Sequence, residues 1–254
     1  MSAGRLSGWR VLVTRQPEQA GGLAEALVRE GAFVVEVPLI EIAPPDDPAP
    51  LQEAVERLEA YDWLALTSAN AARAFAAALG TRPVPKDLRI ATVGRSTTDA
   101  VSEALAGATV ALSPAQDFRA EGLLAAFAGQ DVRGRRVLIP ASARARETLA
   151  AGLTAQGARV DVVTAYRTLT PADAPARLAA ALAGGVDVVT LASPSAVEGF
   201  VSSCPAGAAW PRAVAIGPVT EAAARKAGME VAGVAATAGQ AGIVAVLAGL
   251  TRPR

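Results

Sequence analysis

The sequence contains no histidine and a single cysteine, Cys204. Without histidine there can be no Ser-His-Asp or Cys-His nucleophile system and no histidine-ligated metal. One cysteine excludes an internal disulfide, a cysteine-based zinc site and an iron–sulfur cluster, and is typical of a reducing compartment. We therefore expect any chemistry to depend on hydroxyls, arginines, carboxylates and backbone amides.

Long apolar runs and net charge are also missing. Hydrophobic residues make up 52% of the chain, but no run reaches the roughly 18 residues of a membrane span. The start, MSAGRLSGWRVLVTR, leads directly into a predicted strand and lacks the apolar centre of a signal peptide. The formal net charge of +0 disfavours a nucleic-acid surface. We expect a cytoplasmic, soluble protein with a small-molecule ligand, without nucleic-acid or membrane partners.

Three segments occur twice in the same order. The pairs are 10–15 (RVLVTR) with 136–142 (RVLIPAS), 62–75 (DWLALTSANAARAF) with 187–200 (DVVTLASPSAVEGF), and 89–100 (RIATVGRSTTDA) with 212–223 (RAVAIGPVTEAA). Their starting residues are 126, 125 and 123 positions apart. Such constant spacing indicates an internal duplication.

Each copy alternates short apolar strands with helices rich in alanine and leucine, which is typical of βαβ units in a parallel sheet. Gly31 and Gly157 are predicted to end the first helix of each copy. Two longer predicted strands, 31–42 and 157–168, exceed the usual strand length and could connect two lobes. The predicted fold class is therefore α/β, with two flavodoxin-like parallel-sheet lobes.

The carboxyl ends of the predicted strands are rich in hydroxyl, glycine and arginine residues. Ligands bind at these ends in open α/β sheets, because helix N-termini expose free amides there. For any one of these residues, helix capping alone is the simpler interpretation, but together they favour a polyanionic ligand in a cleft between the lobes. The candidate binding residues are Thr14, Arg15, Ser68, Ala69, Asn70, Gly94, Arg95, Ser96, Thr97, Ser142, Arg144, Arg146, Ser193, Pro194, Ser195, Gly217, Pro218 and Thr220.

Tyr166 lies at the end of the second long strand, beside Arg167 and Thr168. Its phenol could donate a hydrogen bond or a proton, although packing alone would also explain a tyrosine there. Neither G-x-G-x-x-G after a strand nor G-x-x-x-x-G-K-[ST] is present, so nucleotide binding has no support in the sequence.

The chain resembles the uroporphyrinogen-III synthase family over essentially its whole length. The resemblance rests on the order and spacing of VLVTR, PLIEI, TSANA, VGRST, IPASARARETL, AYRT, ASPSA and IGPVT. It implies two α/β lobes joined by a two-stranded β-ladder that acts as a hinge. The first lobe would contain residues 1–40 and 168–254, the second 41–167, with crossings near 33–42 and 158–168.

The resemblance also implies the activity of a cyclising hydro-lyase. Such an enzyme converts hydroxymethylbilane, a linear tetrapyrrole octacarboxylate, into uroporphyrinogen III, with inversion of the last ring, loss of water and no metal or organic cofactor. It implies Tyr166 as the catalytic residue that assists departure of the hydroxyl, and substrate contacts from Ser68, Thr97, Ser193, Thr220 and Arg146. Asn70 stands where some members carry arginine. We expect a monomer that could receive its substrate from hydroxymethylbilane synthase.

Two other classes of protein share parts of this pattern. A two-lobed receptor could bind a small anion without catalysis, but the sequence has no export signal. A two-lobed glycosyltransferase-like enzyme should show a nucleotide-sugar phosphate loop or a carboxylate at a strand end, and neither is visible.

Overall fold

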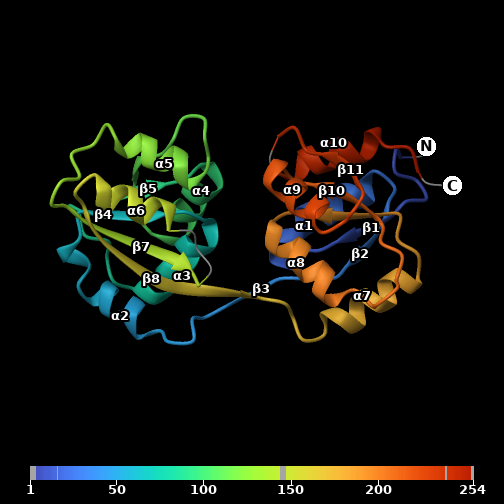
Figure 1. Cartoon of the computed structure of the whole chain (residues 1–254), viewed down its shortest axis with the longest axis horizontal. Coiled ribbons are helices and arrows are strands. Elements are labelled where there is room, and N and C mark those ends of the chain that lie inside the picture. Colours follow the sequence, from blue (N-terminus) through green and yellow to red (C-terminus); the bar gives the residue numbers. More distant parts are fainter. Residues whose placement is uncertain (1–3, 16, 144–146, 238, 253–254) are drawn as a thin grey trace. The chain divides into compact units, whose positions relative to one another are not determined.

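The computed structural model describes residues 4–15, 17–143, 147–237 and 239–252 (Figure 1). The chain divides into two compact units. Unit 1 comprises Met1–Glu41 and Leu169–Arg254, and unit 2 comprises Ile42–Thr168. The predicted fold class, α/β with parallel sheets, is confirmed.

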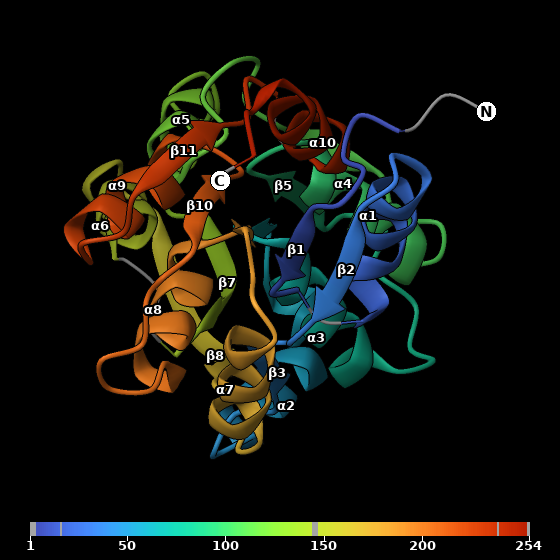
Figure 2. The same cartoon turned by 90° about the vertical axis from the view of Figure 1, so that its right-hand side faces the viewer.

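Unit 1 has a five-stranded sheet in the order β11-β10-β9-β1-β2, and all its strand pairs are parallel. Figure 2 shows β11, β10, β1 and β2 following one another across the unit. The strands are β1 (Arg10–Val13), β2 (Phe33–Glu36), β9 (Val188–Leu191), β10 (Arg212–Ala215) and β11 (Val231–Val234). Apolar side chains of α1 (Pro17–Arg29) and α10 (Gln240–Gly249) pack on one face of the sheet. Those of α7 (Ala174–Ala183), α8 (Pro194–Ser203) and α9 (Pro218–Lys226) pack on the other.

Unit 2 has the same three-layer construction around a sheet ordered β3-β8-β7-β4-β5-β6. Its strands are β3 (Glu41–Ala43), β4 (Trp63–Leu66), β5 (Arg89–Thr92), β6 (Val110–Leu112), β7 (Arg136–Ser142) and β8 (Arg159–Leu169). One face packs against α2 (Ala49–Glu56), the short 3-10 helix η1 (Leu58–Ala60), α3 (Ala69–Leu79) and α4 (Arg95–Ala104). The other face packs against α5 (Ala120–Phe127) and α6 (Thr148–Ala155).

The two sheets have one topology, as the repeats predict. Strands β2-β1-β9-β10-β11 follow the flavodoxin-like order 2-1-3-4-5. In unit 2 the corresponding row is β8-β7-β4-β5-β6, in which the first two strands of the pattern come last in the sequence. The paired segments 10–15 and 136–142 thus occupy the same place in the two sheets, as do the other two pairs.

The predicted long strand at 31–42 is wrong as a single element. β2 ends at Glu36 and β3 begins at Glu41. Pro38 lies between them and has no N–H group for a sheet ladder, so the chain leaves one sheet before it joins the other. The second long strand is confirmed, since β8 runs for 11 residues. β3 neighbours β8 in the sheet, and each contains one of the two points where the chain passes between units.

The predicted glycine caps are also confirmed. Gly31 has φ +89° and Gly157 has φ +93°, a left-handed conformation that a Cβ would strain. The residue after each glycine donates back into the helix, Ala32 N–H to Leu27 (3.0 Å) and Ala158 N–H to Leu153 (3.0 Å). Each first helix therefore ends where the sequence places it.

An aspartate joins two strands at the amino end of each sheet. In unit 2, Asp62 exchanges bonds with Arg136: its N–H donates to the Arg136 carbonyl (2.9 Å), and its carboxylate accepts the Arg136 N–H (2.8 Å). Arg135 Nη1 also donates to this carboxylate (2.9 Å). Asp62 thereby fixes the start of β7 beside that of β4.

Asp187 has the same role in unit 1. Its N–H donates to the carbonyl of Arg10 (3.0 Å), and its carboxylate accepts the Arg10 N–H (2.7 Å) and Arg252 Nε (3.2 Å). The aspartate that begins each copy of the second repeated segment is therefore a structural residue of the sheet.

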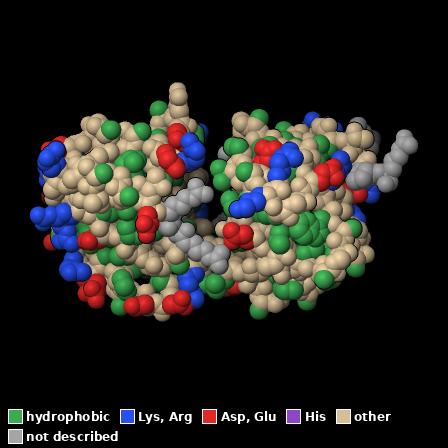
Figure 3. Space-filling view, viewed as in Figure 1, with side chains coloured by type: hydrophobic (Ala, Val, Ile, Leu, Met, Phe, Trp, Pro, Cys, Tyr) green, Lys and Arg blue, Asp and Glu red, His purple; other side chains and the backbone are tan. Residues whose placement is uncertain are grey.

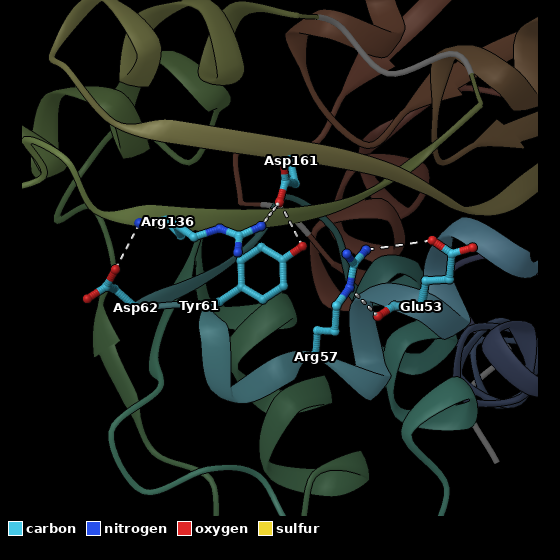
Figure 4. A network of polar contacts seen from close by, with 6 residues as sticks. All are labelled: Glu53, Arg57, Tyr61, Asp62, Arg136 and Asp161. Atoms are coloured by element: carbon cyan, nitrogen blue, oxygen red, sulfur yellow. Dashed lines mark hydrogen bonds and ion pairs between the residues drawn. The ribbon is translucent and has the colours of Figure 1, made fainter.

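Unit 2 adds a buried tyrosine to this amino edge (Figure 4). Tyr61 donates to Asp161 (2.8 Å), which also accepts Arg136 Nη2 (2.9 Å). The Arg136 guanidinium carbon lies 4.9 Å from the centre of the Tyr61 ring. Burial first, and then the hydrogen bond to Asp161, raises the pKa of Tyr61 to about 12. These contacts lie at the strand starts, which is the opposite sheet edge from the predicted ligand site.

Candidate functional site

The predicted binding residues lie at the carboxyl ends of the parallel strands in each unit. In unit 2 these are Ser68, Ala69 and Asn70 after β4, Gly94, Arg95, Ser96 and Thr97 after β5, Ser142 in β7, and Tyr166 in β8. In unit 1 they are Thr14 and Arg15 after β1, Ser193, Pro194 and Ser195 after β9, and Gly217, Pro218 and Thr220 after β10. Arg144 and Arg146 lie outside the described residues.

Unit 2 contains a cavity of about 580 Å³ at this edge. That volume is within the range of small-molecule sites. Ser142 and Tyr166 line it from β7 and β8, and Thr67 and Ser68 from the end of β4. Since β7 and β4 are the strands at which the order of the sheet reverses, the cavity lies at the topological switch point, where open α/β sheets bind ligands.

An irregular register in β8 sets the position of Tyr166. Ala141 of β7 is paired with Thr164, but the next residue, Ser142, is paired with Tyr166. Ala165 is thus an extra residue, a β-bulge of the kind that redirects side chains beside functional sites. Both Ala165 and Tyr166 are buried in the core under α3, and Tyr166 keeps 8% of its surface exposed.

The Tyr166 hydroxyl contacts Ser68 at the start of α3. The two oxygens are 3.0 Å apart, and either can donate. Ser68 is also the N-cap of α3, where its hydroxyl oxygen accepts the N–H of Ala71 (3.0 Å). Ser68 therefore caps the helix and contacts the predicted catalytic tyrosine through the same oxygen.

Two of the predicted hydroxyls of unit 1, those of Thr14 and Ser193, form hydrogen bonds within the unit. Thr14 is fully buried and donates its single hydroxyl proton to the carbonyl of Thr190 (2.8 Å). Ser193 caps α8 by accepting the N–H of Ala196 (3.1 Å). Thr220 is buried in the first turn of α9. The capping interpretation is thus confirmed for Ser193, and substrate contacts from these residues stay predictions.

The two predicted arginines that the structure describes differ in their surroundings. Arg15 is half-buried, and burial lowers the pKa of its guanidinium. Among the described residues no side chain forms a hydrogen bond or ion pair with Arg15. Arg95 is exposed as the first residue of α4. Both cations are therefore available to a ligand carboxylate.

Phe118, an aromatic residue of the segment before α5 that was not predicted, lies beside the N-cap of α4. A Cβ added to Gly94 would lie 2.9 Å from Cδ1 of Phe118, so the Phe118 ring can pack there only because Gly94 has no side chain. Phe118 is 60% exposed. Thr97, one turn further along, is buried. An apolar surface thus lies beside the exposed Arg95 and Ser96.

Sequence reasoning missed much of the cavity wall. Val160, Val162 and Thr164 line it from alternate positions of β8, and Glu147 lines it before α6. The alternation of side chains along a strand could have identified the β8 residues once that strand was predicted. No sequence signal identified Glu147.

Within the described ranges, no group of three or more Asp, Glu or Cys side chains is arranged to hold a metal ion. In that same part of the chain, no helix is long and apolar enough to cross a membrane. On the face shown in Figure 3, acidic and basic side chains are interspersed on each unit.

The fold and cavity define a protein of two parallel-sheet units with a cavity of small-molecule size at a topological switch point of unit 2. The model of the family described as "Uroporphyrinogen-III synthase HemD" matches residues 22–245. The chain therefore belongs to the uroporphyrinogen-III synthase family, and the resemblance inferred from its motifs is confirmed.

Relatives from distant organisms agree with this assignment. The chain is 36% identical over 176 residues to uroporphyrinogen-III synthase of Synechococcus elongatus, a match that covers 67% of this chain and 64% of that protein. It is 32% identical over 226 residues to the chloroplastic uroporphyrinogen-III synthase of Oryza sativa subsp. japonica, which covers 87% and 73%.

Solved structures of this family share the fold. A mutant uroporphyrinogen III synthase from the extremely thermophilic bacterium Thermus thermophilus matches with a TM-score of 0.67 at 20% identity, over 95% of this chain and 97% of that one. The enzyme from Helicobacter pylori gives 0.62 at 13% identity, over 94% and 97%.

Proposed function

We propose that this protein is a uroporphyrinogen-III synthase, a lyase that cyclises hydroxymethylbilane with inversion of the last ring and loss of water. The observation that carries the proposal is the family match, which spans residues from both units. The cavity at the switch point of unit 2 supports it, because the tyrosine that the motifs single out lies in its wall.

The chemistry needs little more than correct positioning. Hydroxymethylbilane loses its hydroxyl readily to give an azafulvene cation, and unassisted closure gives the symmetric isomer I. The enzyme must therefore hold the flexible chain so that carbon attack forms the spiro intermediate. A hydroxyl in the cavity wall suits the first step, since Tyr166 can donate a proton to the departing oxygen.

The substrate carboxylates require donors along the strand ends. In unit 2 the first residues of α3 and α4 offer amides and polar side chains, notably Asn70 and Ser96. Arg15 and Arg95 offer guanidinium groups, which bind carboxylates through two parallel hydrogen bonds. Ser193, Ser195 and the Gly217–Thr220 turn would serve in the same way in unit 1.

We also propose, from the composition and the family, that the protein is cytoplasmic and monomeric. Its substrate is unstable in solution, so direct supply from hydroxymethylbilane synthase would limit spontaneous closure to isomer I.

An isomer assay tests the function. Freshly generated hydroxymethylbilane is incubated with the protein, the products are oxidised, and type I and type III porphyrins are separated by chromatography. We expect predominantly type III. The type I product of the protein-free control would refute the activity and leave an anion receptor as the next hypothesis.

The two tyrosines of the chain provide a matched pair of variants. Tyr166→Phe removes the hydroxyl in the cavity wall and should lower kcat by about 100-fold, the lower range for a lost general acid. Tyr61→Phe removes a hydroxyl that contacts Asp161 at the opposite sheet edge and should leave kcat unchanged at a temperature where it is folded. An undiminished rate in Tyr166→Phe would exclude Tyr166 as the proton donor.

A further inference from the structure

A short chain of hydrogen bonds connects the backbone of α3 with the cavity. The Ala71 N–H donates to Ser68 Oγ (3.0 Å), and Ser68 Oγ lies 3.0 Å from Tyr166 Oη. The first bond anchors Ser68 to the first turn of the helix, so its oxygen has little freedom to move. The second bond then fixes the position of the phenol oxygen.

The Ser68–Tyr166 pair has one O–H hydrogen more than the bond between the two side chains needs. Ser68 and Tyr166 together carry two O–H hydrogens, and the bond between them uses one. Among the described residues, no group accepts a bond from the other. Both side chains line the cavity. Whichever oxygen is the donor within the pair, one O–H remains for a molecule in the cavity.

The internal repeat shows that the helix cap does not require this contact. Ser193 is the counterpart of Ser68, and it caps α8 with the same bond, to Ala196 (3.1 Å). The counterpart of Tyr166, at the 126-residue spacing, is Ile40, which has no hydroxyl. Unit 1 thus builds the same strand–helix junction with the cap alone. The contact to Tyr166 is an addition found in the unit that contains the cavity.

We propose that Ser68 is a positioning residue for Tyr166, and that the two hydroxyls deliver and recover one proton as a pair. This rests on the proposed function. As the C–O bond of the hydroxymethyl group breaks, its electron pair stays with oxygen, which takes the Tyr166 proton and leaves as water. The pyrrole nitrogen lone pair forms the C=N bond of the azafulvene cation. Ser68 shares its proton with the phenolate.

The proton balance closes at the end of the reaction. The spiro intermediate next loses the bond between its quaternary carbon and the original bridging methylene, and that methylene then bonds the free α-carbon of the last ring. This α-carbon loses its proton to restore the aromatic pyrrole, and the pair takes that proton back. One water is released and no further acid or base is consumed. Ser68 acts only through Tyr166 in this scheme and does not need to contact the substrate.

The test compares kcat and KM of Ser68→Ala, Ser68→Thr, Tyr166→Phe and the double variant Ser68→Ala/Tyr166→Phe in the isomer assay. We expect Ser68→Ala to lower kcat about tenfold with KM changed less than about twofold, because orientation is lost and binding is kept. Ser68→Thr keeps the hydroxyl and the cap and should restore most of kcat. The double variant should be no more than about threefold slower than Tyr166→Phe, because Ser68 acts through that residue.

A control separates the lost cap from the lost contact. Ser193→Ala removes the equivalent cap alone, so its unfolding midpoint should fall by less than that of Ser68→Ala, which also loses the bond to Tyr166. With ¹³Cζ-labelled tyrosine, the chain should give two resonances, from Tyr61 and Tyr166. Ser68→Ala should shift the resonance that Tyr166→Phe removes and leave the other in place.

Two results would overturn the inference while the function stands: a wild-type kcat in Ser68→Ala, or a double variant slower than Tyr166→Phe by the full Ser68→Ala factor. Type I product from the wild-type protein would instead refute the function, together with the proton scheme that rests on it.

Discussion

Replacing Asp62 by alanine should destabilise unit 2 without changing the isomer that the protein makes. The carboxylate accepts the backbone N–H of Arg136 (2.8 Å) and Arg135 Nη1 (2.9 Å) at the start of β7. The contact with Arg135 is half-exposed and contributes about 0–1 kcal/mol, as is usual for surface ion pairs. The backbone bond to a charged acceptor contributes about 1.5–3 kcal/mol. We therefore expect Asp62→Ala to lower the free energy of unfolding by about 2–3 kcal/mol.

Asp62→Asn separates the contribution of the backbone hydrogen bond from the contribution of the charge. An asparagine oxygen can still accept the Arg136 N–H, so that only the charge and the Arg135 contact are lost. We expect a loss of about 1 kcal/mol or less for this variant. Urea unfolding followed by circular dichroism and by tryptophan fluorescence would measure both, since Trp63 begins β4 beside Asp62. Asp187→Ala, which removes the corresponding acceptor of Arg10 (2.7 Å), should cost a similar amount in unit 1.

The loss of stability in Asp62→Ala should depend on pH. Burial opposes ionisation of Asp62, but the Arg136 N–H and the Arg135 guanidinium outweigh it, so the pKa of this carboxyl lies below its ordinary value. A depressed pKa contributes stability above the unfolded value of about 3.9, and this contribution disappears as the pH falls through the folded value. The difference between wild type and Asp62→Ala should therefore shrink between about pH 5 and pH 3. Equal stability of the two proteins at pH 7 would refute the structural role of Asp62, and a changed isomer ratio in the folded variant would refute its independence from the site.

Three further predictions concern other parts of the chain. In Tyr166→Phe, Tyr61 is the remaining tyrosine, and its absorbance titration at alkaline pH should have its midpoint near 12. The stability that the protonated Tyr61 contributes is present below the unfolded pKa of about 10 and is lost as the pH rises through the folded pKa. A midpoint near 10 in a natively folded sample would contradict the burial of the Tyr61 hydroxyl. Gly31→Ala and Gly157→Ala should each lower the free energy of unfolding by about 1–2 kcal/mol in urea titrations, because alanine is strained at positive φ; an unchanged midpoint would show that the caps tolerate a side chain. In unit 1, Gly199→Ala places a Cβ 2.3 Å from the Leu39 carbonyl oxygen, whereas the Cβ of Gly249→Ala meets no atom within 4 Å. Thermal unfolding should show that the free energy of unfolding falls by about 1–3 kcal/mol in Gly199→Ala and stays unchanged in Gly249→Ala. Equal stability of the two variants would refute the close packing of α8 on the segment after β2.

Much of the fold follows from patterns that are local in the sequence. The predicted alternation of short apolar strands with helices is confirmed, for example by the strands Trp63–Leu66 and Val188–Leu191 and the helix Ala120–Phe127. They are short apolar runs and an apolar helix between clear turn signals, so local propensity and burial favour the same structure. The prediction of a single long strand over 31–42 was wrong, because the sequence does not show which sheet each half joins. Without that information, the effect of Pro38 could not be compared with the strand preference of the β-branched residues around it.

The candidate site was predictable in kind but not in arrangement. Hydroxyls and glycines at strand ends are visible in the sequence, and parallel pairing brings such ends to one edge of a sheet. Their burial is not visible: Thr14, Thr97 and Thr220 have hydroxyls at strand ends, as the exposed Ser96 does, yet all three are buried. Burial depends on which helix covers each strand end, and this is a property of the packed unit.

The sequence by itself determined the duplication, the parallel α/β class, the helix ends at Gly31 and Gly157, and the chemistry available to a chain without histidine. These follow from composition, spacing and local backbone preference. The tertiary structure alone decided that Tyr166 contacts Ser68, a residue 98 positions earlier in the chain. That contact needs the strand order β8-β7-β4, the extra residue Ala165 in β8 and the cap of α3 to occur together. The cap is local, but the strand order and the extra residue are set by pairing between segments that are distant in sequence, so no local pattern contains the contact.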